Sequence, residues 1–178
     1  MAILLAWATV GLVIALLPDV LDRHGLSAWS GFATLGICSG GVLFQPLARR
    51  LVPATSVRLG LVILPLAYAL IAWGALEGHL AGVLLGALGA SSACYGFIYL
   101  GGLSGVLDTA GDRPARASAG FFLMAYLGFS VPVVVIGALM EHLGQADALA
   151  LFGLALLGAS LQVNGWLWRR SPHSLDAA

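Results

Sequence analysis

Six long runs of apolar residues follow one another along the chain, separated by short polar gaps. Each run is close to or longer than the roughly 20 residues that a helix needs to cross a hydrocarbon layer about 30 Å thick. The runs are continuous, whereas a membrane β-barrel would show alternating polarity in shorter segments. The chain is therefore predicted to be an all-α membrane protein, a single six-transmembrane-helix bundle over residues 1–178. Its spans are expected at about residues 2–18, 30–48, 58–76, 80–107, 117–140 and 147–168.

The gaps indicate how the spans are connected. Pro18 and Asp19 follow the first run, and we expect them to end the first helix. The gap formed by Glu77, Gly78 and His79 is very short. The third and fourth spans are therefore predicted to form an antiparallel pair.

The basic residues are concentrated in alternate gaps. The chain has no lysine, and of its eight arginines only Arg23 lies outside this pattern. Arginine-bearing loops face the cytoplasm, so the loops after the second and fourth spans and the C-terminal tail are expected there. With six spans the N-terminus is then cytoplasmic as well. The seven arginines that agree are Arg49, Arg50, Arg58, Arg113, Arg116, Arg169 and Arg170.

The composition narrows the classes of function. The chain is 60% hydrophobic and 9% charged, with a formal net charge of zero. A lipid bilayer suits such a chain, and no basic surface is available to neutralise nucleic-acid phosphates. No Cys/His cluster has metal-ligand spacing, so no metal or cofactor is expected. No nucleophile–base pair or paired intramembrane carboxylates occur, which argues against an enzyme.

Uncharged polar residues inside the spans are the candidates for substrate binding. Aromatic rings and hydroxyls can bind an amphipathic substrate by stacking and hydrogen bonding. The alternative is that these hydroxyls satisfy each other or backbone carbonyls between packed helices. Both interpretations stay open for Tyr95 and Tyr126, and packing is favoured for the others. The candidates are Trp7, Thr34, Tyr126 with Ser130, and the set Ser92, Tyr95 and Tyr99, whose i, i+3, i+7 spacing places them on one helix face.

Two stretches resemble the major facilitator superfamily of transporters. The segment 41–50 is similar to the loop motif that follows the second span of each half in that family. Gly41, Leu43, Arg49 and Arg50 match the motif, whereas Gln45 stands at the position of its aspartate. The segment 113–121, leading into 126–132, resembles the entry to the penultimate span.

The resemblance implies a fold, a function and a set of gate residues. Six spans with both ends inside correspond to the C-terminal half of such a transporter, built from two inverted three-helix repeats. It implies transport of a small molecule by alternating access, with a second six-helix half supplied by a homodimer or a separate chain. A faint repeat trace agrees: Ser and Phe open both the second and the fifth span. The implied cytoplasmic gate-loop residues are Gly41, Gln45, Arg49, Arg50, Asp108, Arg113 and Arg116.

Alternative interpretations remain beside transport. Arg49 and Arg50 either pair with a carboxylate such as Asp108 in a gate or serve only as topology determinants, and the loss of the motif's aspartate weakens the gate. The chain is otherwise a truncated, non-transporting remnant or a membrane scaffold or interaction subunit. The absence of lysine beside abundant Ala, Gly, Leu and Arg indicates a GC-rich bacterial genome, hence a bacterial cytoplasmic (inner) membrane.

The arginine pattern makes a direct topological prediction. A reporter fused after Arg170 should lie in the cytoplasm, because the positive-inside rule places that end there. Paired fusions check this, with a fluorescent protein that folds only in the cytoplasm and a phosphatase that is active only outside it. Phosphatase activity from the fusion after Arg170 would overturn the orientation.

Overall fold

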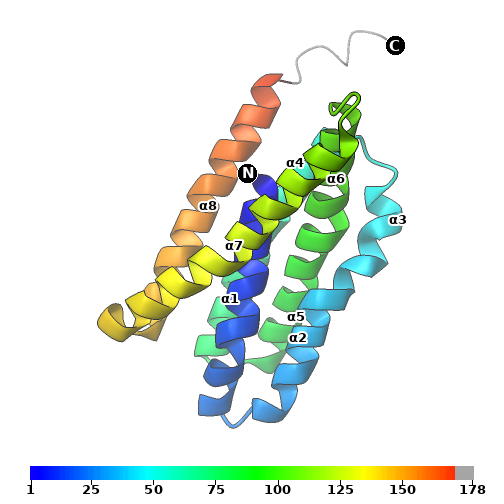
Figure 1. The fold of residues 1–178 in the computed structure, drawn as a ribbon. Coiled ribbons are helices and arrows are strands. Elements are labelled where there is room, and N and C mark those ends of the chain that lie inside the picture. The colour runs from blue at the N-terminus through cyan, green and yellow to red at the C-terminus, as the bar shows by residue number, and fades with distance from the viewer. Residues whose placement is uncertain (171–178) are drawn as a thin grey trace.

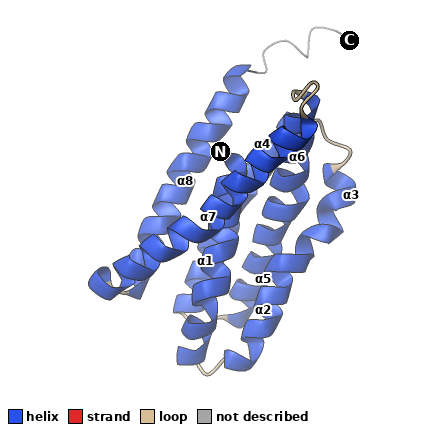
Figure 2. Ribbon diagram, in the orientation of Figure 1, coloured by secondary structure: helices blue, strands red, loops and turns tan. Residues whose placement is uncertain are grey.

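The computed structural model describes residues 1–170, and the regular structure in this range is entirely helical (Figure 2). Six helical stretches are long and apolar enough to cross a membrane, as the sequence predicts, and they lie together as a bundle (Figure 1). We refer to these stretches as spans one to six. In order they are α1 (Ala2–Arg23); the series 27–48, which contains α2 (Ser30–Ser39) and α3 (Gln45–Ala48); α4 (Pro53–Leu76); the series of α5 (Leu80–Ser91), a π-helical segment (Ser92–Ile98) and α6 (Tyr99–Asp108); α7 (Pro114–Leu143); and α8 (Gln145–Arg170).

The first helix is longer than the sequence pattern predicts. The expectation that Pro18 and Asp19 end it is wrong, because α1 continues to Arg23 with Pro18 inside it. Arg23 donates to the Asp19 carboxylate at 2.9 Å, one helical turn away. Such i, i+4 pairs favour the last turn of a helix modestly. The pair also offsets the charge of the one arginine outside the predicted cytoplasmic gaps.

Other helix ends also extend beyond the apolar runs. α4 begins at Pro53 and α7 at Pro114, several residues before the predicted starts. Proline suits the first position of a helix, because its missing N–H is not needed there and its φ is already helical. Between α7 and α8 the turn contains only Gly144, whose φ of 84° favours glycine. Polar residues that the sequence assigned to loops therefore lie in helical ends.

Spans three and four form the antiparallel pair that the short gap predicts, and glycines line the contact between them. A Cβ on Gly60 would lie 2.6 Å from Ile98, and one on Gly101 would lie 2.8 Å from the Pro53 carbonyl oxygen. Gly86 makes an equally close approach to Ile71. In lipid, helix association depends on such close packing, because the lipid tails are as apolar as the helix side chains and the hydrophobic effect does not drive helices together. Glycine therefore allows the close contact between spans three and four.

The crossing of α7 over α1 depends on two further glycines. α7 runs obliquely across α1 in Figure 1, and it packs more extensively against α1 than against any other helix. A Cβ on Gly11 would lie 2.5 Å from the Phe129 carbonyl oxygen, and one on Gly128 would overlap the backbone of Leu4. Each helix thus presents a glycine to the backbone of the other.

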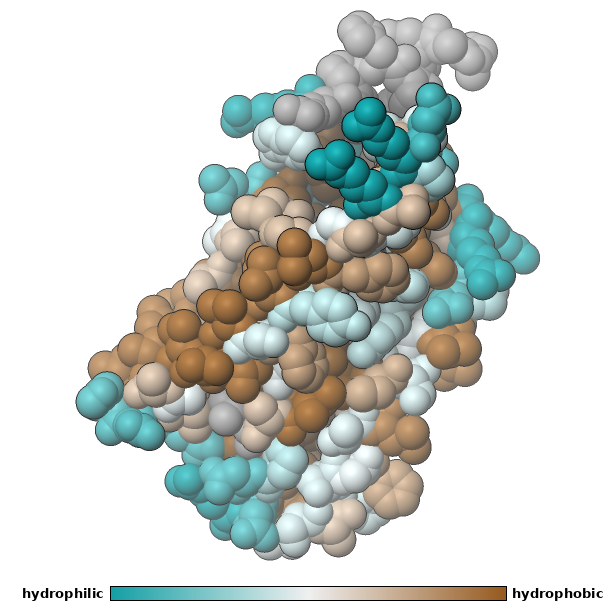
Figure 3. Space-filling view, viewed as in Figure 1, coloured by the Kyte–Doolittle hydropathy of each residue, from teal (hydrophilic) through white to brown (hydrophobic). Residues whose placement is uncertain are grey.

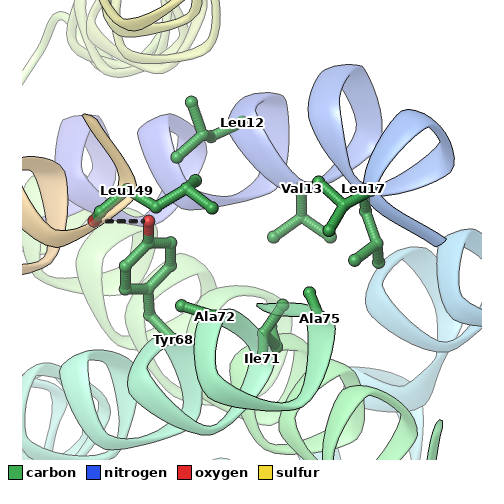
Figure 4. Close-up of a pocket in the computed structure, with 9 residues that line it drawn as sticks. Leu12, Val13, Leu17, Tyr68, Ile71, Ala72, Ala75 and Leu149 are labelled. Atoms are coloured by element: carbon green, nitrogen blue, oxygen red, sulfur yellow. Dashed lines mark hydrogen bonds between the residues drawn. The ribbon is translucent and has the colours of Figure 1, made fainter. Parts of the chain in front are cut away.

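A buried hydroxyl joins α4 to α8. Tyr68 donates to the carbonyl oxygen of Leu149 at 2.9 Å, as Figure 4 shows. Tyr68 and Leu149 also line a nearly apolar cavity of about 20 Å³ between α1, α4 and α8. That volume is about the minimum for one water, and its apolar lining offers a water no partner. The cavity is a packing defect of the core and is too small for a ligand.

The α1–α7 crossing predicts the effect of one added methyl group. Gly128→Ala should lower the free energy of unfolding by about 1–3 kcal/mol, because the methyl must push apart two backbones. Unfolding in mixed detergent micelles measures this. Gly137→Ala on the same helix is the control, since its Cβ would meet nothing within 4 Å. Equal stability of the two variants would contradict the described crossing.

Candidate functional site

The π-helical segment Ser92–Ile98 is held by hydrogen bonds from three other spans. The Gly41 N–H donates to Ser91 Oγ at 2.7 Å, immediately before the segment. Ser56 Oγ donates to the Phe97 carbonyl at 2.9 Å, and the Cys94 thiol to the Ala6 carbonyl at 3.3 Å. A π-helical turn departs from the regular hydrogen-bond ladder and is often found at functional sites. Spans one, two and three therefore fix an irregular segment in the middle of span four.

An aromatic cluster lies where this segment meets spans one and five. The ring of Trp7 lies 5.0 Å from Tyr95 and 6.0 Å from Tyr99, centroid to centroid. Tyr99 continues the cluster to Phe121 at 6.1 Å and Phe122 at 6.3 Å on α7. These separations are typical of favourable aromatic pairs. The structure thus brings together three sequence candidates, Trp7, Tyr95 and Tyr99, from two spans that are far apart in sequence.

The cluster continues outward along α7. Phe122, Tyr126 and Ser130 are spaced by four residues and share one face of that helix. All three are exposed, and 69% of the Tyr126 surface is accessible against 38% for Phe122. Figure 3 shows pale, weakly polar side chains gathered beside the brown apolar surface of α7.

Span two reaches the same cluster from the opposite side. The thiol of Cys38 is exposed and lies beside the Tyr95 phenol. Thr34 precedes Cys38 by one turn on the same face of α2. We call the combined surface the polar strip: it consists of Trp7, Thr34, Cys38, Tyr95, Tyr99, Phe122, Tyr126 and Ser130, from spans one, two, four and five.

Ser92 does not belong to the polar strip. The prediction that Ser92 shares a helix face with Tyr95 and Tyr99 is based on regular α-helical spacing. The segment is π-helical instead, and its wider turn changes the direction in which these side chains point. Ser92 is buried, and its hydroxyl donates to the Gly89 carbonyl at 2.7 Å within its own span. The packing interpretation therefore describes Ser92, whereas Tyr95 and Tyr99, one turn apart, both reach Trp7.

Gly41 also has a packing role in this structure. A Cβ at this position would lie 2.5 Å from the Ser91 carbonyl oxygen and 2.7 Å from Tyr95 Cβ. The glycine of the loop motif thus lets span two touch span four beside the aromatic cluster. Gln45, at the motif's aspartate position, begins α3 and is half-buried.

The charged gate-loop candidates remain apart. Arg49 and Arg50 are exposed after α3, and Asp108 is exposed at the end of α6. Within residues 1–170 no ion pair joins either arginine to Asp108. Arg113 and Arg116 are exposed at the start of α7. In this conformation the residues do not form the charge pairing that a closed gate would require.

Sequence reasoning did not find Phe121 and Phe122. Both look like ordinary lipid-facing residues within an apolar run, and nothing local distinguishes them. The i, i+4 spacing from Phe122 to Tyr126 is the signal that could have identified one of them. Their contact with Tyr99 depends on the way α7 crosses α1, which hydropathy does not report.

The polar strip offers ring faces and hydroxyls but no charged side chain. Such a surface can bind and orient a small molecule, and it holds no pair of groups arranged for acid–base chemistry. No family model, no curated protein and no solved structure matches the chain.

The bracing of the π-helical segment predicts a measurable stability difference. Ser56→Ala should lower the free energy of unfolding by about 0.5–2 kcal/mol, because it leaves the buried Phe97 carbonyl without its donor. Titration with a denaturing detergent measures the change. Thr55→Ala, at the exposed neighbouring position, is the matched control. If both variants unfold at the same detergent fraction, the bond does not brace the segment.

Proposed function

We propose that this chain is one six-helix half of a transporter that moves a small neutral or amphipathic molecule by alternating access. It works as a homodimer or beside a separate second half. We place it in the bacterial inner membrane with both termini in the cytoplasm, as the arginine distribution favours. The second half would cover the polar strip, and the substrate would bind between the two halves.

The observation that carries this proposal is the outward-facing hydroxyl of Tyr126. Tyr126 lies near the middle of α7, which runs from residue 114 to 143, so its side chain lies near the middle of the bilayer. It is 69% exposed. Hydrocarbon offers a hydroxyl no hydrogen-bond partner, and polar groups at this depth usually face protein or a water-filled cavity. A second helical bundle against this face would supply protein contacts for the hydroxyl, a water-filled cavity, or both.

The uneven burial of the spans supports the same conclusion. In the most apolar stretch of α7 only 17% of residues are buried, against 61% in span four. Spans two and six are also poorly buried, each at 28%. Spans two and five flank the polar strip on its two sides. The bundle therefore leaves one polar-containing side without protein cover.

The order of helix contacts supports an inverted repeat. In two three-helix repeats, span one corresponds to span four, two to five and three to six. Exchanging the two repeats turns a contact between spans one and five into a contact between spans four and two. Both of these pairs pack closely in this structure. The contact of α4 with α8, spans three and six, maps onto itself and is also extensive.

The chemistry of the polar strip favours an uncharged or amphipathic substrate. Trp7, Tyr95 and Tyr99 offer stacking surfaces, and the tyrosines offer hydroxyls. An ion would need a fixed counter-charge at this depth, and no charged residue belongs to the strip. In this proposal Arg49, Arg50, Arg113 and Arg116 border the cytoplasmic opening, and they would meet carboxylates only when that opening closes.

If the substrate passes along the polar strip, single substitutions in the strip should lower the rate of transport. Trp7→Ala should lower uptake of a small uncharged or amphipathic dye into proteoliposomes by at least about tenfold, because an aromatic anchor is lost. Tyr126→Phe should lower it by about three- to tenfold, the value of one hydrogen bond. Trp73→Ala, at an exposed span end, is the control and should leave uptake unchanged.

A cross-linking experiment distinguishes a transporter from the two alternatives, a scaffold and a non-transporting remnant. In a Cys38→Ser background, cysteine at Tyr126 should cross-link to a second copy or another chain in native membranes. Cysteine at Leu154, equally exposed on α8, should not. Cross-linking at Tyr126 without uptake of any dye, in a strain whose drug tolerance is unchanged by deletion, would indicate the scaffold instead. Absence of both results would leave the non-transporting remnant.

A further inference from the structure

A second, larger hollow lies at the arginine-bearing end of the bundle. It has a volume of about 980 Å³ and is bounded by α1, α4, α6, α7 and α8. Its lining is apolar except for a few side chains, chiefly Asp108, Thr109 and Gln162. Cavities of about 300–1,000 Å³ accommodate drug-sized or lipid-sized groups. Only Phe121 touches both this cavity and the aromatic cluster, so the cavity is a separate site.

The cavity lies at the level of one membrane leaflet. Its walls are the first turns of α1 and α4 and the last turns of α6 and α8. The arginine-bearing loops begin where those helices end. An acyl chain of that leaflet can therefore occupy the apolar volume while its headgroup remains level with the loops.

An arginine with unused donors joins α4 to α8, and both it and its α8 partners are next in sequence to residues that line the cavity. Arg58 follows the lining residue Val57 and is half-buried between α4 and α8. Its Nε donates to Asn164 Oδ1 at 3.2 Å, and its guanidinium carbon lies 4.1 Å from the centre of the Trp168 ring. Within residues 1–170 its Nη groups have no hydrogen-bond acceptor. A guanidinium held in this way presents its remaining donors to an oxyanion, and phosphate suits their geometry.

Asp108 is the charged side chain among the residues that line the cavity, but exposed arginines at the same end of the bundle favour an anionic headgroup outside it. Arg113 and Arg116 lie on the α6–α7 side and Arg169 lies at the end of α8, all exposed. Asp108 and Asp112 are the acidic residues on the α6–α7 side. Arginines together outnumber these carboxylates, and each basic residue near the surface strengthens binding of an anionic lipid about fivefold.

We propose that this cavity binds an anionic phospholipid, with an acyl chain in the apolar volume and the phosphate on Arg58. The site is independent of transport. It would tie the bundle to the lipid composition of the arginine-facing leaflet, because the lipid would fill the space between α8 and the other helices. Asp108 opposes the anionic headgroup and limits the strength of binding.

Native mass spectrometry of the purified chain tests the proposal. The detergent-solubilised protein is incubated with phosphatidylglycerol or phosphatidylcholine carrying the same acyl chains, and bound lipid is counted. We expect phosphatidylglycerol to bind at least about fivefold more tightly. Arg58→Gln should weaken binding of both lipids, because both carry the phosphate. The loss should be larger for phosphatidylglycerol, because in phosphatidylcholine the choline cation offsets the phosphate charge, so most of the preference should disappear. Asp108→Asn should strengthen phosphatidylglycerol binding.

A cavity-filling variant tests the acyl-chain position. Gly105 lines the cavity, and a Cβ there would meet only Pro53 Cβ at 3.7 Å, so Gly105→Leu can fold. The leucine should displace at least two methylene groups and weaken binding of both lipids about tenfold. Gly158→Leu, at an exposed position of α8 with nothing within 4 Å, is the control.

Three outcomes would overturn the proposal. One is equal binding of the two lipids, and another is an unchanged preference in Arg58→Gln. The third is equal lipid retention by Gly105→Leu and Gly158→Leu when both elute as folded, monodisperse protein. Should Gly105→Leu fail to fold, the Arg58→Gln comparison decides the question by itself. None of these results depends on whether the chain transports a molecule.

Discussion

Close contact between helix backbones is the interaction on which the rest of this structure depends. In a bilayer the apolar side chains of one helix gain little by leaving lipid for another helix, so packing must supply the stability. Gly60, Gly86 and Gly101 bring spans three and four together, and Gly11 and Gly128 do the same for spans one and five. The positions of these glycines determine which helices touch and which faces remain outside.

The candidate site is a consequence of that packing. Because span four lies so close to spans two and three, the Gly41 N–H can reach the Ser91 hydroxyl and the Ser56 hydroxyl can reach the Phe97 carbonyl oxygen. The π-helical segment then orients Tyr95 and Tyr99 toward Trp7 and leaves Ser92 buried. The crossing of α7 adds Phe121 and Phe122. The candidate surface of neutral rings and hydroxyls is thereby assembled from four spans without a charged residue.

The two features with functional potential occupy different depths. The polar strip lies on a poorly buried side of the bundle, where the proposed second half would cover it. The large cavity lies in one leaflet, next to Arg58 and the arginine-rich loops. The first location suits a substrate that crosses the membrane, and the second suits a lipid that stays in it. The same bundle can therefore carry both without competition for one site.

The sequence by itself determined the number of spans, the antiparallel pairing of spans three and four, and most of the aromatic candidates. Hydropathy and loop length are local properties, and they are sufficient for these conclusions. Only the tertiary structure decided that α1 continues past Pro18, that Ser92 turns away from Tyr95, and that Gly41 packs against span four. It alone revealed Phe121, Phe122 and the cavity beside Arg58. In lipid every face of a helix can be apolar, so hydropathy cannot indicate which face meets another helix; backbone contacts between distant spans decide it.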